Sequence, residues 1–222
     1  MANAGKIPEH EAIYLRIRQM VLFGELAPGQ AVTILGLRDK LGAGMTPVRE
    51  AIRRLTAEGA LERADNRRVR VPLMTANVLD ELYFARITLE PRLARMAAER
   101  HGPALADALQ VIDQTLDQAI LSGDIRGYLE HNYKFHFCLY EAAGAQVLFR
   151  LVSSLWLRIG PSLRIMGGLP STRDLPDKHA AAIAALRANA PDQVAQLIEE
   201  DLRQGMDQVA LSLRDGSFDH IG

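Results

Sequence analysis

The stretch "MTPVREAIRRL" (Met45–Leu55) decides how the first third of the chain folds. It opens on a threonine and a proline and continues with apolar residues at helical spacing, which predicts a helix that begins at Thr46. Thr46 is expected to cap this helix through its hydroxyl. Pro47 suits the first helical position, because the N–H that proline lacks has no partner there. One face of the helix carries Val48, Ile52 and Leu55.

The same helix carries three arginines. Arg49 and Arg53 lie one turn apart, and Arg54 flanks them. A helix N-terminus offers unpaired N–H groups and the positive end of its dipole to a phosphate. Arg49, in the first turn, can form a bidentate pair with guanine, whereas Arg53 and Arg54 lie further along and suit phosphates. On an isolated helix a solvated arginine face would be the simpler interpretation, so the neighbouring segments decide.

Those segments predict a winged helix-turn-helix over residues 8–73. Apolar spacing indicates a first helix around residues 13–21 and a second at 34–41, and the short turn "GAG" leads from the second into the third. Gly59 ends the third helix. Two short strands, "ALER" and "RVRVP", then flank the turn "ADNR", which predicts a hairpin. Its tip carries Arg67, Arg68 and Arg70. Basic groups on both the helix and the hairpin favour DNA binding over a winged helix used for protein contact alone.

Composition is that of an ordinary globular protein. Of 222 residues, 48% are hydrophobic and 24% charged. Residues 1–73 hold 12 lysines and arginines against 8 acidic residues, a net charge of +4, and the remainder holds 14 against 19, a net charge of −5. The single Cys138 excludes an internal disulfide framework and argues against zinc fingers. Since no membrane-spanning run or signal peptide is recognisable, we expect a cytoplasmic protein without a membrane partner.

The second half is predicted to be all helical. Periodicity and stop signals such as "HGP" (101–103) predict six helices that form one domain over residues 75–214. They span about residues 75–100, 104–121, 124–143, 145–166, 177–189 and 192–214. The fold class is therefore mostly α: three helices plus a β-hairpin, followed by a six-helix bundle.

Several motifs resemble the GntR family of bacterial transcription regulators. The segments "LAPGQAV", "TPVREAIRRLTAEGALER" and "RRVRVP" are similar to its winged-helix domain. The segments "ARITLEPRLARMAAE", "NYKFHFCLYEAAG" and "DKHAAAIAALRANAPDQVAQLIEED" resemble the helical effector domain of the FadR-like branch, called FCD. The resemblance implies operator DNA as partner, and it implies that Thr46, Arg49 and Arg67 contact DNA. Arg53, Arg54 and Arg68 are the further candidates.

The chain departs from the family pattern at three places. Ile34 and Leu35 replace an acidic residue and an arginine at the start of the second helix. Gly44 and Met45 replace a common Ser-Arg, and Arg68 replaces the wing glycine. We therefore expect an unusual operator, or more affinity from the wing.

The resemblance also implies a divalent metal in the helical domain. Many members of the branch bind an ion through one Asp and three His. Here Asn132 stands at the Asp position, His136 and His179 at two His positions, and Asp201 at the third. The candidate ions are zinc, nickel and manganese. Because a neutral amide is a poor zinc ligand, we expect weaker binding or a shift toward manganese or nickel. The alternative is a polar pocket without metal.

Arginines in the helical domain are candidates for an effector carboxylate. Arg86 and Glu90 form an R-x-x-x-E pattern, which is either a weak surface pair or an inward Arg86 that grips a carboxylate. Arg158 and Arg164, near Trp156, are secondary candidates. The prediction is thus a homodimeric regulator, a repressor, whose operator affinity a small organic acid controls, in concert with the metal. A metal-dependent helical enzyme using the His/His/Asp site is the alternative, but no general base, nucleophile or phosphate loop accompanies those residues.

Overall fold

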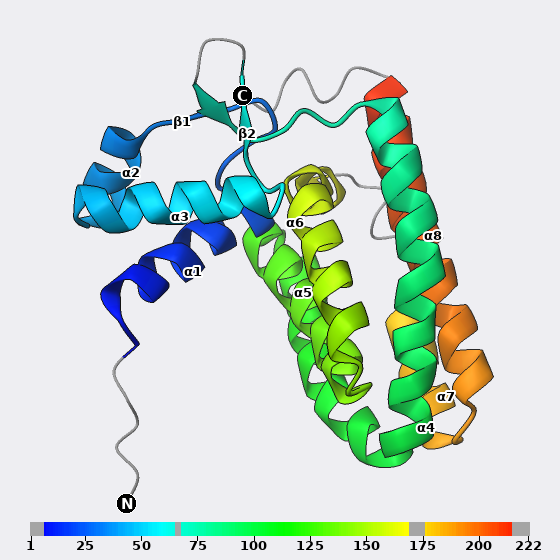
Figure 1. The fold of residues 1–222 in the computed structure, drawn as a ribbon. Helices are drawn as coiled ribbons and strands as arrows, with labels where there is room; N and C mark the ends of the chain where they lie inside the picture. Colours follow the sequence, from blue (N-terminus) through cyan, green and yellow to red (C-terminus); the bar gives the residue numbers. More distant parts are fainter. Residues whose placement is uncertain (1–6, 65–67, 169–175, 215–222) are drawn as a thin grey trace, which may run out of the picture.

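The computed structural model describes residues 7–64, 68–168 and 176–214. Figure 1 shows α1 to α3 and a small sheet lying across one end of a bundle of long helices. The elements are α1 (Glu9–Leu22), β1 (Ala31–Val32), α2 (Ile34–Leu41), α3 (Met45–Ala57), β2 (Glu62–Arg63), β3 (Val69–Arg70), α4 (Ala76–Ser122), α5 (Ile125–Ala142), α6 (Gln146–Gly168), α7 (Lys178–Arg187) and α8 (Pro191–Arg214).

The predicted amphipathic face of α3 is confirmed, but its start is not. Val48, Ile52 and Leu55 are buried. The helix begins at Met45, because Gly44 is the N-cap residue and its carbonyl accepts the first helical hydrogen bond. The prediction that Thr46 caps α3 is therefore wrong: its hydroxyl makes no capping bond, and it already lies in the first turn. Pro47 is tolerated two positions later than predicted, at the third helical residue, since all N–H groups of the first turn lack helical acceptors.

The predicted hairpin is present as β2 and β3. The sheet has a third strand that the pattern did not reveal: β1, only two residues long, pairs with the other side of β3, in the order β1-β3-β2. The N–H of Ala64 donates to the carbonyl of Arg68 at 2.7 Å and closes the described part of the hairpin. Arg68 is exposed. The predicted wing contact Arg67 lies outside the described residues.

The six predicted helices of the second half appear as α4 to α8, with α4 divided by a kink. Gly102 has φ 38° and ψ −119°, which interrupts the helix next to Pro103, as the "HGP" signal predicted. The two parts of α4 pack against α5, α7 and α8 to form the bundle core. None of the helices in the described part of the chain is long and apolar enough to cross a membrane.

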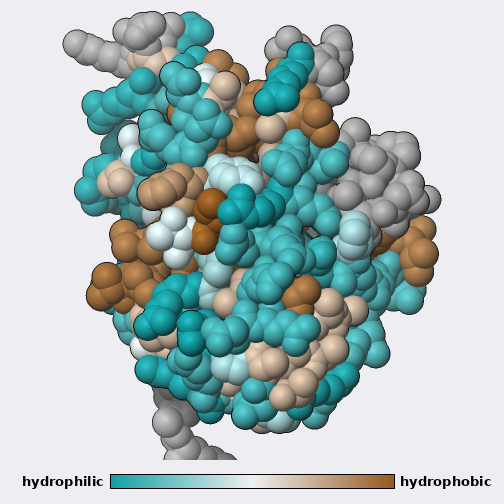
Figure 2. Space-filling model, turned by 90° about the vertical axis from the view of Figure 1, so that its right-hand side faces the viewer, coloured by the Kyte–Doolittle hydropathy of each residue, from teal (hydrophilic) through white to brown (hydrophobic). Residues whose placement is uncertain are grey.

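The two halves of the chain are packed tightly together. Helix α6 contacts both α1 and the bundle. At the contact, a Cβ atom on Gly160 would lie 2.8 Å from the carbonyl oxygen of Leu22, so only glycine lets the end of α1 approach this closely. The side of the molecule turned toward the viewer in Figure 2 is largely hydrophilic, with apolar side chains in small separate patches. The winged-helix half is thus seated on the bundle through α6.

Candidate functional site

A cavity of about 330 Å³ lies inside the helical half, with walls from α4, α5, α6, α7 and α8. Apolar walls come from Leu116, Ile120, Leu163 and Leu202. Polar side chains that line it include Arg86, Asp113, Tyr128, Asn132, His136, Trp156, His179 and Asp201. A few convergent polar groups in a mostly preformed cavity are typical of a small-ligand site.

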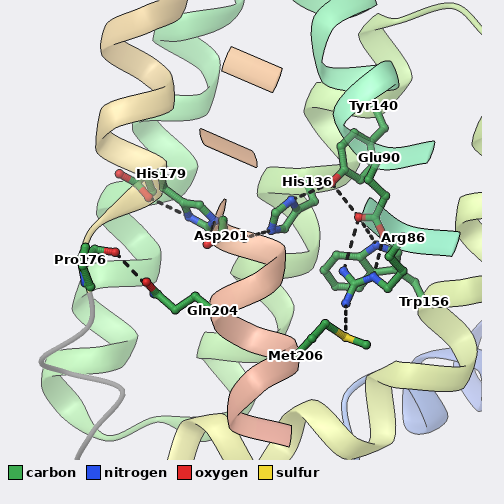
Figure 3. Close-up of polar contacts among 11 residues, drawn as sticks. Arg86, Glu90, His136, Tyr140, Trp156, Pro176, His179, Asp201, Gln204 and Met206 are labelled. Carbon is green, nitrogen blue, oxygen red and sulfur yellow. Dashed lines mark hydrogen bonds and ion pairs between the residues drawn. The ribbon is translucent and has the colours of Figure 1, made fainter. Parts of the chain in front are cut away.

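Three of the four predicted metal ligands converge in this cavity. One possible ligand atom each from His136, His179 and Asp201 lies within 4.8 Å of the others. Figure 3 shows the two imidazoles approaching the carboxylate from opposite sides. His136 Nε2 lies 3.2 Å from Asp201 Oδ2, and His179 Nε2 lies 3.7 Å from Asp201 Oδ1. Asn132 lines the same cavity from α5, one turn before His136.

The environment of His179 fits a metal ligand. Its Nδ1 lies 3.2 Å from Asp113 Oδ1, and its ring stacks on Phe135 with centroids 3.8 Å apart. Its Nε2 is buried and has no hydrogen-bond partner among the described residues. A buried polar atom without a partner is costly, and a histidine whose second nitrogen bonds a carboxylate is the usual arrangement of a metal ligand. The donor set of two imidazoles, a carboxylate and a nearby amide therefore fits a divalent ion.

Electrostatics distinguish the two histidines. Burial lowers the pKa of His136 and outweighs Asp201, whose charge and hydrogen bond would favour the protonated ring. Burial would also lower the pKa of His179, but the charge of Asp201 and the hydrogen bond and charge of Asp113 outweigh it, so that pKa is raised. For Asp201, burial acts to raise the pKa, yet the two histidines beside it hold it below its ordinary value. The charged carboxylate is therefore favoured at this position, as a metal ligand requires.

Arg86 points inward, so the interpretation as a weak surface pair is wrong. Arg86 and Glu90 are 2% and 0% exposed, and Arg86 Nε donates to Glu90 Oε1 at 2.6 Å. The guanidinium also lies 4.6 Å from the ring centroid of Trp156, and Nη1 contacts Met206 Sδ at 3.5 Å. Arg86 lines the cavity, but much of its hydrogen-bonding capacity is used by Glu90.

Arg158 and Arg164 do not line the cavity, which corrects their prediction as effector ligands. Both are exposed and face the winged-helix half. Arg164 Nη1 donates to the carbonyl of Gly24 at 3.0 Å, and the Arg158 guanidinium lies against Gly59. The reason is helical geometry: Trp156 occupies the bundle face of α6, and these two arginines fall on its other side.

The arginines of α3 differ in how many contacts they make with other side chains of the protein. Arg49 and Thr46 are exposed, and Arg49 forms no hydrogen bond or ion pair with any described residue. Arg53 pairs with the neighbouring Glu50 at 2.8 Å. Arg54 is bound to Glu11 and Glu58 and covers the ring of Tyr14 at 3.5 Å. Arg49 is thus the α3 arginine most available to a partner.

Comparison with known proteins identifies the family. The profile described as "Bacterial regulatory proteins, gntR family" matches residues 9–71, and that of the FCD domain matches residues 81–204. The chain belongs to the GntR family. This GntR-family chain is therefore a transcription regulator with a DNA-binding helix-turn-helix and a ligand-binding FCD domain, and the family is not one of enzymes.

Relatives of this GntR-family protein cover nearly all of it. It is 27% identical to the HTH-type transcriptional regulator McbR of Escherichia coli (strain K12) over 213 residues, which are 93% of this chain and 96% of McbR. It is 28% identical to the Nta operon transcriptional regulator of Aminobacter aminovorans over 189 residues, 84% and 88% of the two chains. The solved structure of Escherichia coli McbR/YncC superposes with a TM-score of 0.86 at 25% identity, covering 93% of this chain and 99% of that one.

Sequence reasoning missed two residues of the site in this GntR-family protein. Asp113 lies on the buried face of α4, between Leu109 and Leu116. A carboxylate among the apolar residues of a helix face is a signal that could have identified it. Tyr140 follows His136 by one turn of α5 and is fully buried. Nothing in its spacing distinguished it from an ordinary core tyrosine.

Proposed function

We propose that this protein is a homodimeric repressor whose affinity for a roughly palindromic operator is controlled by a divalent metal and a small carboxylate bound in the FCD cavity. Residues 8–73 would form the DNA-binding domain and residues 75–214 the sensor. The observation that carries the proposal is the convergence of His136, His179 and Asp201 in a cavity whose walls include α6, the helix on which the winged-helix half is seated. Repression agrees with the name of one relative, the probable D-xylose utilization operon transcriptional repressor of Paenarthrobacter nicotinovorans.

The proposed DNA contact begins with Arg49. Its exposed guanidinium, without a partner among the described residues, suits a bidentate pair with guanine. Thr46 and the exposed N–H groups of the first turn suit a phosphate. Arg53 and Arg68 are exposed and add phosphate contacts, with Arg67 as the remaining wing candidate. Arg54 contributes less directly, because Glu11 and Glu58 already compensate its charge.

The proposed metal is held by His136, His179 and Asp201, with the Asn132 side chain as a fourth ligand. Zinc, nickel or manganese suits this set of nitrogen and oxygen donors. When bound, the ion supplies a positive charge that can bind an effector carboxylate. That charge matters because the Arg86 guanidinium is already paired with Glu90. Arg86 can therefore attract the effector carboxylate electrostatically, but its two-pronged hydrogen-bonding edge is no longer free.

Effector control needs a route from the cavity to DNA. A ligand shifts operator affinity only if it binds the two arrangements of the dimer with different affinity. Helix α5 carries Asn132 and His136 toward the cavity and packs on α6, which contacts α1. A small movement of α5 or α6 on ligand binding would therefore change the spacing of the two reading helices.

Operator binding is tested with the full chain and DNA from immediately upstream of its own gene. We expect affinity that falls steeply as salt rises, and a loss of at least about tenfold in Arg49→Ala, in line with one guanine contact. Arg95→Ala is the matched control: it removes the same charge from α4, where Arg95 pairs with Glu99 and Asp192. Binding that does not respond to salt, or equal losses in both variants, would contradict the proposed interface.

Metal binding is tested by measuring bound metal in protein purified without chelator. We expect about one divalent ion per chain, lost in His136→Ala and in His179→Ala. His131→Ala is the control, since His131 lies on the same helix but does not line the cavity. Protein that carries no ion, and binds none when zinc, nickel or manganese is added, would rule out the metal part of the proposal.

A further inference from the structure

A chain of buried hydrogen bonds leads from Arg86 to His136. Glu90 is completely buried and accepts hydrogen bonds from Arg86 Nε at 2.6 Å and Trp156 Nε1 at 3.0 Å. The hydroxyl of Tyr140 donates to Glu90 Oε2 at 2.7 Å. The same hydroxyl lies 3.0 Å from His136 Nδ1 (Figure 3). All five side chains belong to α4, α5 and α6.

Proton counting decides the direction of the last bond. A carboxylate that faces a guanidinium, an indole N–H and a hydroxyl acts only as acceptor, so Tyr140 must donate to Glu90. The hydroxyl of Tyr140 has a single hydrogen, and the bond to Glu90 uses it. Toward His136 the Tyr140 oxygen can therefore only accept, and His136 Nδ1 must carry the hydrogen.

The consequence is that neutral His136 presents a lone pair at Nε2. That atom lies 3.2 Å from Asp201 Oδ2, at the wall of the cavity. The neutral His179 ring is arranged in the same way, with its hydrogen on Nδ1 and a lone pair on Nε2. Its Nδ1 faces Asp113, and its Nε2 has no partner among the described residues. When both rings are neutral, two lone pairs and a carboxylate therefore face one another without a hydrogen between them, which is unfavourable unless a cation joins them.

We propose that Tyr140 and Glu90 are positioning residues that hold His136 as the Nδ1–H tautomer, ready to bind a metal through Nε2, and connect this ligand to Arg86 and Trp156. This inference rests on the metal site of the proposed function. Without the Tyr140 hydroxyl, His136 would place its hydrogen on Nε2 and donate it to Asp201, since that acceptor is in reach. The metal would then have to displace that hydrogen.

The connection to Trp156 provides a second readout. Trp156 is the chain's only tryptophan, its indole N–H bonds Glu90, and its ring centroid lies 5.2 Å from that of His136. Zinc bound by His136 should therefore alter the intrinsic fluorescence of the protein. The same change should be smaller in Tyr140→Phe, because the hydrogen-bonded connection between His136 and Glu90 is broken.

The test uses the full chain, stripped of metal and labelled with ¹⁵N-histidine, at pH 8. At that pH an ordinary imidazole is neutral. Long-range ¹H–¹⁵N spectra, assigned with His136→Gln, should show hydrogen on Nδ1 in the wild type and on Nε2 in Tyr140→Phe. Competition titrations should show zinc affinity about 10- to 100-fold weaker in Tyr140→Phe, the usual cost of losing a residue that orients a metal ligand. Tyr14→Phe is the control: it also removes a phenol that donates to a glutamate, Glu58, but Tyr14 lies on α1 and does not line the cavity, so zinc affinity should equal that of the wild type.

Each result separates the inference from the proposed function. Hydrogen on Nε2 of His136 in the wild type overturns the inference even if Tyr140→Phe does not fold. Zinc binding that is equally tight in wild type and folded Tyr140→Phe also overturns it, and leaves the metal site standing. A wild type that binds no divalent ion overturns the metal site itself, and with it the role of Tyr140 and Glu90.

Discussion

Tyr133 of α5 lies edge-on to Phe23 at the end of α1, with ring centroids 5.9 Å apart. Tyr133 also stacks on Phe137 at 4.0 Å and meets Trp156 edge-on at 5.6 Å. Its neighbour in sequence, Asn132, lines the cavity. Helix α5 therefore faces the proposed ligand on one side and the DNA-binding half on the other, and the aromatic cluster is one of the contacts that connect the two halves.

Replacing Tyr133 with leucine is expected to weaken this coupling. The variant should bind the upstream DNA about as well as the wild type without metal, but zinc should change its operator affinity less. We expect the coupling free energy to fall by about 1 kcal/mol. Fluorescence anisotropy of labelled DNA, with and without zinc, measures the difference. Tyr133→Phe keeps the ring contacts and should respond as the wild type does; an unchanged zinc response in Tyr133→Leu would contradict the route.

Gly160→Ala is expected to destabilise the protein by about 1–3 kcal/mol. Its new methyl group would lie 2.8 Å from the carbonyl oxygen of Leu22, so α1 and α6 would have to separate. Gly205→Ala on α8 is the matched control: its methyl group meets no atom within 4 Å, and alanine should stabilise the helix by about 0.5–1 kcal/mol. Urea denaturation of both variants provides the test. Equal stabilities would show that the junction tolerates a side chain.

Zinc affinity is expected to fall with decreasing pH, and the fall should begin above pH 6.5. A metal binds only neutral imidazole. The charges of Asp201 and Asp113 outweigh burial and raise the pKa of His179 above the ordinary histidine value of 6.5. Protons therefore compete for His179 first as the pH drops. Zinc titrations from pH 8 to pH 5.5 measure the midpoint of this loss.

Asp113→Asn should move that midpoint to lower pH. The variant removes a charge and a hydrogen bond that favour protonated His179. At pH 8 it should also weaken zinc binding about tenfold, because the carboxylate that orients His179 is gone. Asp107→Asn changes an exposed carboxylate on the same helix and should leave both quantities unchanged. A pH profile that is the same in all three proteins would exclude a role for Asp113.

Arg54→Ala should affect folding rather than base recognition. Its guanidinium bridges Glu11 and Glu58 and covers Tyr14, so its loss should cost about 1 kcal/mol of folding stability. Arg49→Ala, on the same helix, should leave stability unchanged and lose DNA binding. Thermal unfolding and DNA titration of the two variants form a direct comparison. The assignment fails if the roles are reversed.

Helix positions and the order of the elements could be predicted from the sequence because they depend on local chemistry. The apolar spacing of Val48, Ile52 and Leu55, the stop at Gly59 and the break at Gly102 each act within a few residues. The pairing of Asn132 with His136 on one helix face follows from the same period. The resemblance to a family singled out His136, His179 and Asp201, and the structure brings these three side chains together.

Contacts between distant segments could not be predicted in this way. Helical spacing tells which residues share a face, but not what that face meets. His179 and Asp113 are 66 residues apart, and Tyr140 and Glu90 are 50 apart. Arg158 and Arg164 lie close to Trp156 in sequence, yet they face the winged-helix half while Trp156 faces the cavity. Side-chain roles in this protein depend on which helices pack together, because burial and hydrogen-bond partners come from the neighbouring helix and not from the residue's own.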